Sequence, residues 1–223
     1  MSDSPVVDGR RARGDASRRS VLSRATHLAS VEGLDGLTIG RLAETSGHSK
    51  SSIATLFGSK QSLQVATVAA AREVFVATII EPSRAEPRGL SRLVVLMRRA
   101  LDYSRERTFE GGCFFAATSA DIDSKPGPVR DALREALSEW YGYVAAQIRY
   151  AADAGELALA ASDAEALAFH LIALDQEANN RSLLFEDDAP YALAVAGMRE
   201  RLLAAGADAR MLSPLTAPDA GTR

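Results

Sequence analysis

Apolar residues recur at helical spacing along most of the chain. Val21, Ala25 and Leu28, for example, lie three or four positions apart, which is the pattern of an amphipathic helix, and Gly33 follows as a stop signal. Val and Ile cluster nowhere in the alternating pattern of a strand. The predicted fold is therefore all-α. About nine helices are expected, over residues 17–32, 39–45, 50–56, 60–80, 89–107, 113–118, 129–154, 163–185 and 191–205.

The two ends of the chain lack this periodicity. Residues 1–15 mix Gly, Pro, Ser and charged residues and are predicted to form a flexible arm. Residues 211–223 are rich in Pro, Thr and Gly and are predicted to form a loose tail. Between them, residues 16–62 are expected to form one small domain of short helices and residues 63–210 a larger helical domain.

The charge of the chain is unevenly distributed. The formal net charge is −3, but residues 10–60 contain nine basic and four acidic residues, a local charge of +5. Such a basic segment on an acidic body is typical of a nucleic-acid-binding module joined to another domain, although an Arg-rich tail on an ordinary domain is an alternative. The N-terminus lacks the apolar segment of a secretory signal, and no apolar run reaches the ~18 residues of a membrane span. We expect a cytoplasmic protein without a membrane partner.

Enzyme and metal chemistry find little support. The single cysteine, Cys113, excludes an intramolecular disulfide, and the three histidines, His27, His48 and His170, are far apart in the sequence. Glycine-rich nucleotide-binding loops and the Gly-x-Ser-x-Gly motif of hydrolases are absent from the sequence. We therefore expect no enzymatic activity, no cofactor and no bound metal.

The second and third predicted helices have the plan of a helix-turn-helix. A tight turn at Gly47 separates them, and the third helix begins with small polar residues and a lysine. Ile53, Leu56 and Phe57 would anchor this helix to its neighbours, which leaves its N-terminal turn free to enter the major groove of DNA. The alternative is an ordinary capped helical hairpin with a solvated face.

At these residues the sequence resembles the TetR-type transcriptional regulators. The segment SRRSVLSRATHLASVEGLDGLTIGRLAETSGHSKSSIATLFGSKQSL is similar to their DNA-binding region from end to end. The most specific stretches are Leu37-Thr38-Ile39, Leu42-Ala43, Gly47 through Lys50 and Phe57-Gly58-Ser59-Lys60. The resemblance implies a homodimeric repressor that binds a palindromic double-stranded DNA operator and is released by a small-molecule effector. A transcriptional activator of the same fold is also compatible with this segment.

The resemblance also implies which residues contact DNA. Thr38 and Lys60, each at a helix N-terminus, correspond to phosphate-contacting positions, and both positions suit an anion. Ser49, Lys50, Ser51, Ser52 and Thr55 correspond to groove-facing positions, and Arg18 and Arg19 to an arm that touches the backbone or the minor groove.

Two positions depart from the family pattern. Family members usually have an aromatic residue directly after the position of Ile53, and often a His or Tyr just before the Phe, where this chain has Ala54 and Leu56. The aromatic residue normally braces the recognition helix against a phosphate. Its loss keeps open an alternative function, an all-α small-molecule-binding or enzyme-like protein with a degenerate helix-turn-helix.

The C-terminal domain is expected to bind the effector and to dimerise. An effector pocket needs an apolar cavity with a few polar groups, and its predicted residues are Tyr103, Phe114, Phe115, Trp140, Tyr143, His170, Glu177 and Asn180. The resemblance implies a dimer interface on the last two long helices, with Leu167, Leu171, Leu174, Leu193, Met198 and Leu202 as its predicted residues. Ordinary packing in the core of the subunit is the alternative role for each of these side chains.

Overall fold

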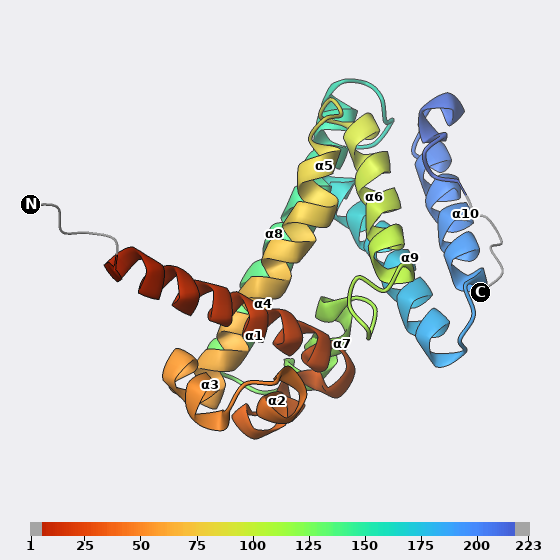
Figure 1. Ribbon diagram of the computed structural model, residues 1–223. Helices are drawn as coiled ribbons and strands as arrows, with labels where there is room; N and C mark the ends of the chain where they lie inside the picture. Colours follow the sequence, from red (N-terminus) through yellow and green to blue (C-terminus); the bar gives the residue numbers. More distant parts are fainter. Residues whose placement is uncertain (1–5, 217–223) are drawn as a thin grey trace, which may run out of the picture.

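The structure, a computed structural model, describes residues 6–216, and its regular elements are all helical (Figure 1). The elements are α1 (Val6–Gly36), α2 (Ile39–Ser46), α3 (Lys50–Phe57), α4 (Lys60–Phe75), a π-helical turn η1 (Val76–Ile80), α5 (Glu81–Ser83), α6 (Leu90–Arg105), α7 (Phe114–Ile122), α8 (Pro128–Asp153), a 3-10 turn η2 (Ala161–Asp163), α9 (Ala164–Leu184), α10 (Ala189–Ala204) and a second 3-10 turn η3 (Ala209–Leu212). Within residues 6–216 this makes nine helices when α4, η1 and α5 are counted as one. The all-α prediction is confirmed.

Helices α1, α2 and α3 form a small domain at one end of the molecule, and α4 leads from it along α8 into the larger domain (Figure 1). Val21, Leu42, Ile53 and Leu63 are fully buried and form the core of the small domain. Glycines end its helices where the sequence predicts. Gly33 interrupts α1 with a φ of 75°, and Gly47 ends α2 in the left-handed conformation, with a φ of 71°.

The N-terminal helix is longer than predicted. It begins at Val6, so residues 6–15, which the sequence predicts to be an irregular arm, are helical, and residues 1–5 lie outside the described part of the chain. Residues 11–16 are exposed, so tertiary packing does not hold them in this form. Their Ala and Arg content favours extension of the helix from the packed residues that follow.

The C-terminal tail also differs from the prediction. Leu212 is fully buried and Leu215 is only 1% exposed. Arg98 of α6 donates hydrogen bonds to the carbonyl and hydroxyl oxygens of Thr216. Residues 211–216 therefore dock on the body through two apolar side chains, rather than forming a loose tail, and residues 217–223 lie outside the described range.

The continuous helix Lys60–Ser83 is central to the large domain. By length and composition it is the one helix within residues 6–216 that could cross a membrane, with a mean hydropathy of 1.6 over its most apolar window. In the structure 44% of that window is buried, and the helix packs against α1, α6 and α8. Its apolar side chains thus supply core contacts between the two domains.

Candidate nucleic-acid interface and effector cavity

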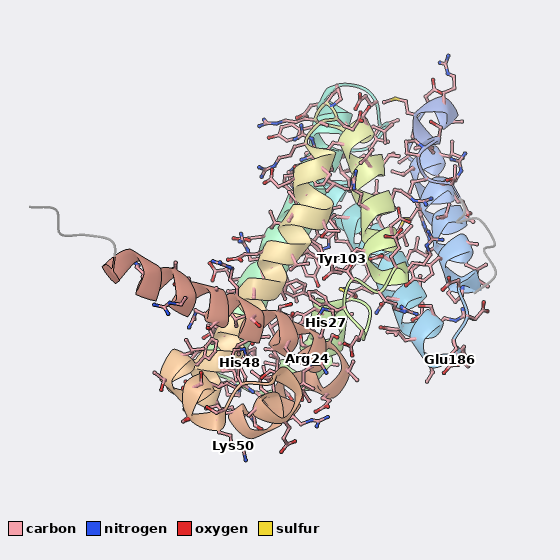
Figure 2. The ribbon with its side chains drawn as sticks, in the orientation of Figure 1. Arg24, His27, His48, Lys50, Tyr103 and Glu186 are labelled. Carbon is pink, nitrogen blue, oxygen red and sulfur yellow. The ribbon has the colours of Figure 1, made fainter. Side chains whose placement is uncertain are left out.

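The exposed N-terminal turn of α3 brings the predicted groove-facing residues together. Ser49, Lys50, Ser51 and Ser52 are exposed at the N-terminal end of the helix, and Thr55, one turn after Ser51, is exposed as well. Figure 2 shows Lys50 at the outer edge of the small domain, pointing away from the rest of the molecule. The opposite face holds the helix in place through two buried anchors, Ile53 and Phe57.

The hydroxyl groups of this turn first stabilise the helix. Ser49 Oγ accepts a hydrogen bond from the backbone N–H of Ser52 at 3.1 Å, the geometry of an N-cap, and lies 3.0 Å from Ser51 Oγ. Thr55 Oγ1 donates to the backbone oxygen of Ser51 at 2.9 Å. The turn is therefore preorganised, and a hydroxyl such as that of Ser51 can still exchange its partner for a base edge or a phosphate oxygen.

The predicted phosphate-contacting residues lie at two further helix N-termini. Thr38 caps α2, since its Oγ1 accepts from the N–H of Arg41 at 3.0 Å. Lys60 begins α4 and donates from Nζ to the backbone oxygen of Asp35 at 2.8 Å, and among residues 6–216 it forms no ion pair with a carboxylate. The N-terminal partial charges of α2 and α4 and the ammonium group of Lys60 together favour a bound anion.

The two arginines predicted to reach DNA differ in their surroundings. Arg19 is exposed. Arg18 instead turns inward, because its Nη1 donates to the carbonyl oxygen of Leu56 at 2.8 Å and its guanidinium group lies 4.5 Å from the centre of the Phe57 ring. Arg18 thereby braces α1 against the C-terminal end of α3, which is a structural role that the sequence pattern does not reveal.

A cavity of about 220 Å³ lies between α4, α8 and α9 and the N-terminal end of α7. Three of the residues predicted for an effector pocket, Phe115, Trp140 and Tyr143, line it. Two further lining residues were not predicted: Phe75, whose ring packs edge-on against Trp140 with 5.1 Å between ring centres, and Asp175. Asp175 could have been found from its spacing, because it lies four positions after the buried Leu171 on the inward face of α9.

The remaining predicted pocket residues do not line this cavity. Phe114 is fully buried in the core, and Tyr103 is buried behind Phe75, 5.5 Å away between ring centres. His170, Glu177 and Asn180 are exposed on the outer face of α9. The prediction was wrong for these three because the helical repeat places them opposite the face that packs against α8 and α6.

The cavity carries polar groups without partners. Asp175 Oδ1 and the hydroxyl oxygen of Tyr143 are buried in its lining and form no hydrogen bond within the described structure. Burial raises the pKa of Asp175 to about 7. Burial, together with the charge of Asp175, raises the pKa of the Cys113 thiol to about 12, so this thiol is neutral and a poor nucleophile at neutral pH.

The outer face of α9 and α10 exposes large apolar side chains. Phe169, Leu184 and Leu193 are 71%, 77% and 61% exposed. Of the residues predicted for the dimer interface, Leu193 lies on this face and Leu174 is half-buried against Gly197. Leu167, Leu171, Met198 and Leu202 are buried within the subunit, so they cannot contact a second copy; the prediction selected the inward face of each helix.

The small and large domains are tied together through α1 and α7. The carboxylate of Asp121 at the end of α7 accepts a hydrogen bond from the N–H of Asp35 at 2.9 Å, and Lys125 forms ion pairs with both carboxylates. In the loop that precedes α7, the N–H of Gly111 donates to Ser30 Oγ of α1 at 3.0 Å. Arg24 and His27, labelled in Figure 2, face the adjacent loop, where Arg24 forms an ion pair with Glu110 at 3.1 Å.

Metal ligands do not gather in the described part of the chain. Within it, no group of three or more His, Cys, Asp or Glu side chains lies close enough to hold a metal ion.

Comparison with known proteins places this geometry in a family. The model of the family described as "Tetracyclin repressor-like, C-terminal domain" matches residues 89–198. No curated protein matches the chain. Among solved structures, a TetR-family regulator from Agrobacterium tumefaciens superposes with a TM-score of 0.75 at 21% identity, covering 85% of this chain and 98% of its own. A TetR regulator from Chloroflexus aurantiacus gives a TM-score of 0.72 at 20% identity, covering 86% and 95%.

A third similar solved structure contains both a small molecule and DNA. It is AibR in complex with isovaleryl coenzyme A and operator DNA, with a TM-score of 0.61 at 15% identity, covering 73% of this chain and 85% of its own. At such low identities, the structural similarity establishes the fold alone. The family match of the C-terminal domain and the helix-turn-helix of the small domain agree with that fold. Residues 89–198 match the C-terminal domain of tetracycline repressor-like proteins, and the chain as a whole has the fold of the TetR-family transcriptional regulators.

Proposed function

We propose that this protein is a repressor that binds a palindromic operator as a homodimer and releases it when a small molecule occupies the cavity beside Asp175. The observation that carries the proposal is the preorganised N-terminal turn of α3, which presents Lys50 and three serine hydroxyl groups outward on a capped helix. A helix of this kind fits the major groove, where lysine and hydroxyl groups read base edges.

The exposed apolar face of α9 and α10 supports the dimer. Phe169, Leu184 and Leu193 would otherwise remain in water, and a two-fold interface buries the same patch from both subunits. A dimer would present two copies of α3, and half-sites one helical turn apart, about 34–36 Å, are the expected operator spacing.

A line of ring contacts joins the cavity to the small domain. Trp140 contacts Phe75, Phe75 contacts Tyr103, Tyr103 contacts Phe109, and Phe109 contacts His27 of α1, with 5.1–6.0 Å between successive ring centres. A molecule that displaces Phe75 would shift packed neighbours rather than compress them, because protein interiors are close-packed. AibR, which was crystallised with both an acyl coenzyme A and operator DNA, supports an effector-responsive role in this fold.

DNA binding tests the proposal directly. Fluorescence anisotropy with labelled DNA from just upstream of the protein's own gene should give selective binding that weakens steeply with salt. Lys50→Ala should weaken binding, and Lys60→Ala should reduce the salt slope by about one unit. Arg134→Ala, which removes an exposed arginine of α8 paired with Asp131, is the matched control and should leave both unchanged.

The opposite results are equally informative. Binding no tighter than to random DNA, tested across the flanking intergenic regions, would favour the alternative of a small-molecule-binding protein with a degenerate helix-turn-helix. The specific observation behind that alternative is Ala54, which is exposed on α3 where family members usually carry an aromatic brace.

A further inference from the structure

The polar groups of the cavity beside Asp175 are distributed unevenly. Its wall is largely apolar, and Phe75, Phe115, Trp140 and Tyr143 contribute four aromatic rings to it. Among its lining residues, one oxygen of Asp175 and the hydroxyl oxygen of Tyr143 are buried without a hydrogen-bond partner in the described part of the chain. Buried polar atoms in a folded protein nearly always have partners, so two orphaned oxygens in the lining of one cavity indicate that a bound molecule supplies the donors.

The charges facing the cavity favour a cation. Arg72 of α4 lies at the cavity wall, but its charge is neutralised by an ion pair with Glu139 of α8. Arg84 is likewise paired with Glu81 at 2.8 Å. Within residues 6–216 no basic side chain lowers the pKa of Asp175, which burial alone raises. The carboxyl group of Asp175 is thus the uncompensated ionisable group of the cavity, and Cys113 and Tyr143 add no positive charge.

We infer that the effector of this protein is a small lipophilic amine, bound as its ammonium ion with an N–H group directed at Asp175 and its apolar part against Phe75, Trp140 and Phe115. An ammonium group supplies hydrogen-bond donors and no acceptor, which suits the two orphaned oxygens of Asp175 and Tyr143. Aromatic faces add cation–π attraction at the same place. A cavity of about 150 Å³ accepts benzene, so this one, at about 220 Å³, accommodates one ring with a short side chain.

This inference rests on the proposed function, since it names the chemical class of its effector. It also implies a pH signature. Asp175 must be ionised to pair with an ammonium ion, and with a pKa of about 7 it is mostly protonated at pH 6 and mostly ionised at pH 8. Ammonium binding should therefore tighten about tenfold from pH 6 to pH 8, whereas the binding of a neutral molecule should not.

Three probes of matched shape test the inference on the full-length protein. They are 2-phenylethylammonium, neutral propylbenzene and anionic 3-phenylpropanoate, and the fluorescence of Trp140, the single tryptophan of the chain, reports on their binding. The expected result is that the ammonium probe binds at least tenfold more tightly than the other two at pH 8 and loses about tenfold at pH 6.

Two variants separate Asp175 from its surroundings. Asp175→Asn keeps the shape of the side chain and should abolish both the ammonium preference and the pH dependence. Glu165→Gln removes an exposed carboxylate from the same helix and should preserve both. Should Asp175→Asn fail to fold, as judged by circular dichroism, the wild-type pH series on the ammonium and neutral probes decides the matter.

Each remaining outcome has a distinct meaning. Equal or tighter binding of propylbenzene or 3-phenylpropanoate, an ammonium preference that survives in Asp175→Asn, or no binding of the ammonium probe at millimolar concentration would overturn the inference. Operator anisotropy measured in parallel judges the proposed function separately. Ammonium binding without DNA release would support the ligand class and contradict the effector response, and loss of all DNA binding would contradict the regulator alone.

Discussion

The carboxylate of Asp121, at the end of α7, accepts a hydrogen bond from the backbone N–H of Asp35, in the turn between α1 and α2. This bond joins the large domain to the turn that positions α2 and, through it, α3. Partial burial raises the pKa of Asp121, but the hydrogen bond from Asp35 and the nearby Lys125 outweigh it, so the pKa is lowered overall. The ionised carboxylate is therefore the form that the folded protein favours.

Loss of this link should loosen the small domain. We expect Asp121→Ala to lower the free energy of unfolding by about 1 kcal/mol at pH 7 and to speed amide exchange in residues 33–38. Asp123→Ala, two residues later and exposed, is the control and should do neither. Because the folded pKa of Asp121 lies below its unfolded value, its contribution is full above pH ~4 and disappears as the pH falls through the folded pKa. Equal exchange rates in the two variants would show that the link carries no constraint.

The contact between Gly111 and α1 should be intolerant of a side chain. A Cβ atom on Gly111 would overlap the backbone carbonyl oxygen of Ser30, so we expect Gly111→Ala to destabilise the protein by about 2–3 kcal/mol. Gly142, within α8, has open space at the same position, and Gly142→Ala should stabilise by about 0.5–1 kcal/mol. Chemical denaturation of both variants measures the contrast, and a Gly111→Ala protein as stable as the wild type would show that the two domains separate easily.

Restoring an aromatic residue on α3 should strengthen DNA binding. Ala54 is exposed one position after the buried anchor Ile53, so a tyrosine there reaches solvent without disturbing the core. Its hydroxyl group could donate to a phosphate, and one such bond of about 1 kcal/mol corresponds to roughly fivefold tighter binding. Anisotropy with operator DNA tests Ala54→Tyr, with Ala54→Phe as the control that lacks the hydroxyl. A gain shared equally by both variants would assign the effect to ring packing instead.

The dimer should depend on the exposed side chains of α9 and α10. A charge at Phe169 or Leu193 would face the same charge on the partner across a two-fold axis, so Phe169→Glu and Leu193→Glu should each shift the protein toward monomer in analytical ultracentrifugation. DNA affinity should fall in both variants as dimerisation is lost. Tyr150→Glu alters an exposed aromatic residue of α8, outside this face, and should remain dimeric. Monomeric wild-type protein at micromolar concentration would contradict the proposed dimer.

The buried carboxyl group of Asp175 should make stability depend on pH in the opposite sense to Asp121. Its folded pKa, about 7, lies above its ordinary value, so the folded state binds the proton more tightly and loses stability as the pH rises from about 4 to about 7. Asp175→Asn lacks this penalty. We expect the variant and the wild type to be similar at pH 4–5 and the variant to be more stable by a few kcal/mol at pH 8, as measured by thermal unfolding. Parallel stability curves would show that Asp175 is solvated or paired.

Periodicity and capping residues predicted most of the secondary structure correctly. Thr38, Ser49 and Ser59 each cap the helix that follows, and Gly33 and Gly47 end the helices that precede them. These signals are local, because a cap or a left-handed residue acts within one turn of backbone. The exposed turn of α3 was predictable for the same reason: its residues are consecutive in the sequence.

Only the tertiary structure decided which face of each long helix is inward. Leu171 and His170 are adjacent on α9, yet one is fully buried and the other is exposed. The rotation of a helix depends on all the elements that pack against it, and α9 contacts α6, α8 and α10 at once. This is why the predicted dimer residues were mostly core, and why Asp175 was not recognised as part of a cavity. The sequence alone determined the helices and the exposed N-terminal turn of α3 through local backbone chemistry. The cavity, the exposed apolar face of α9 and α10 and the inward orientation of the Arg18 side chain arose instead from contacts between distant segments.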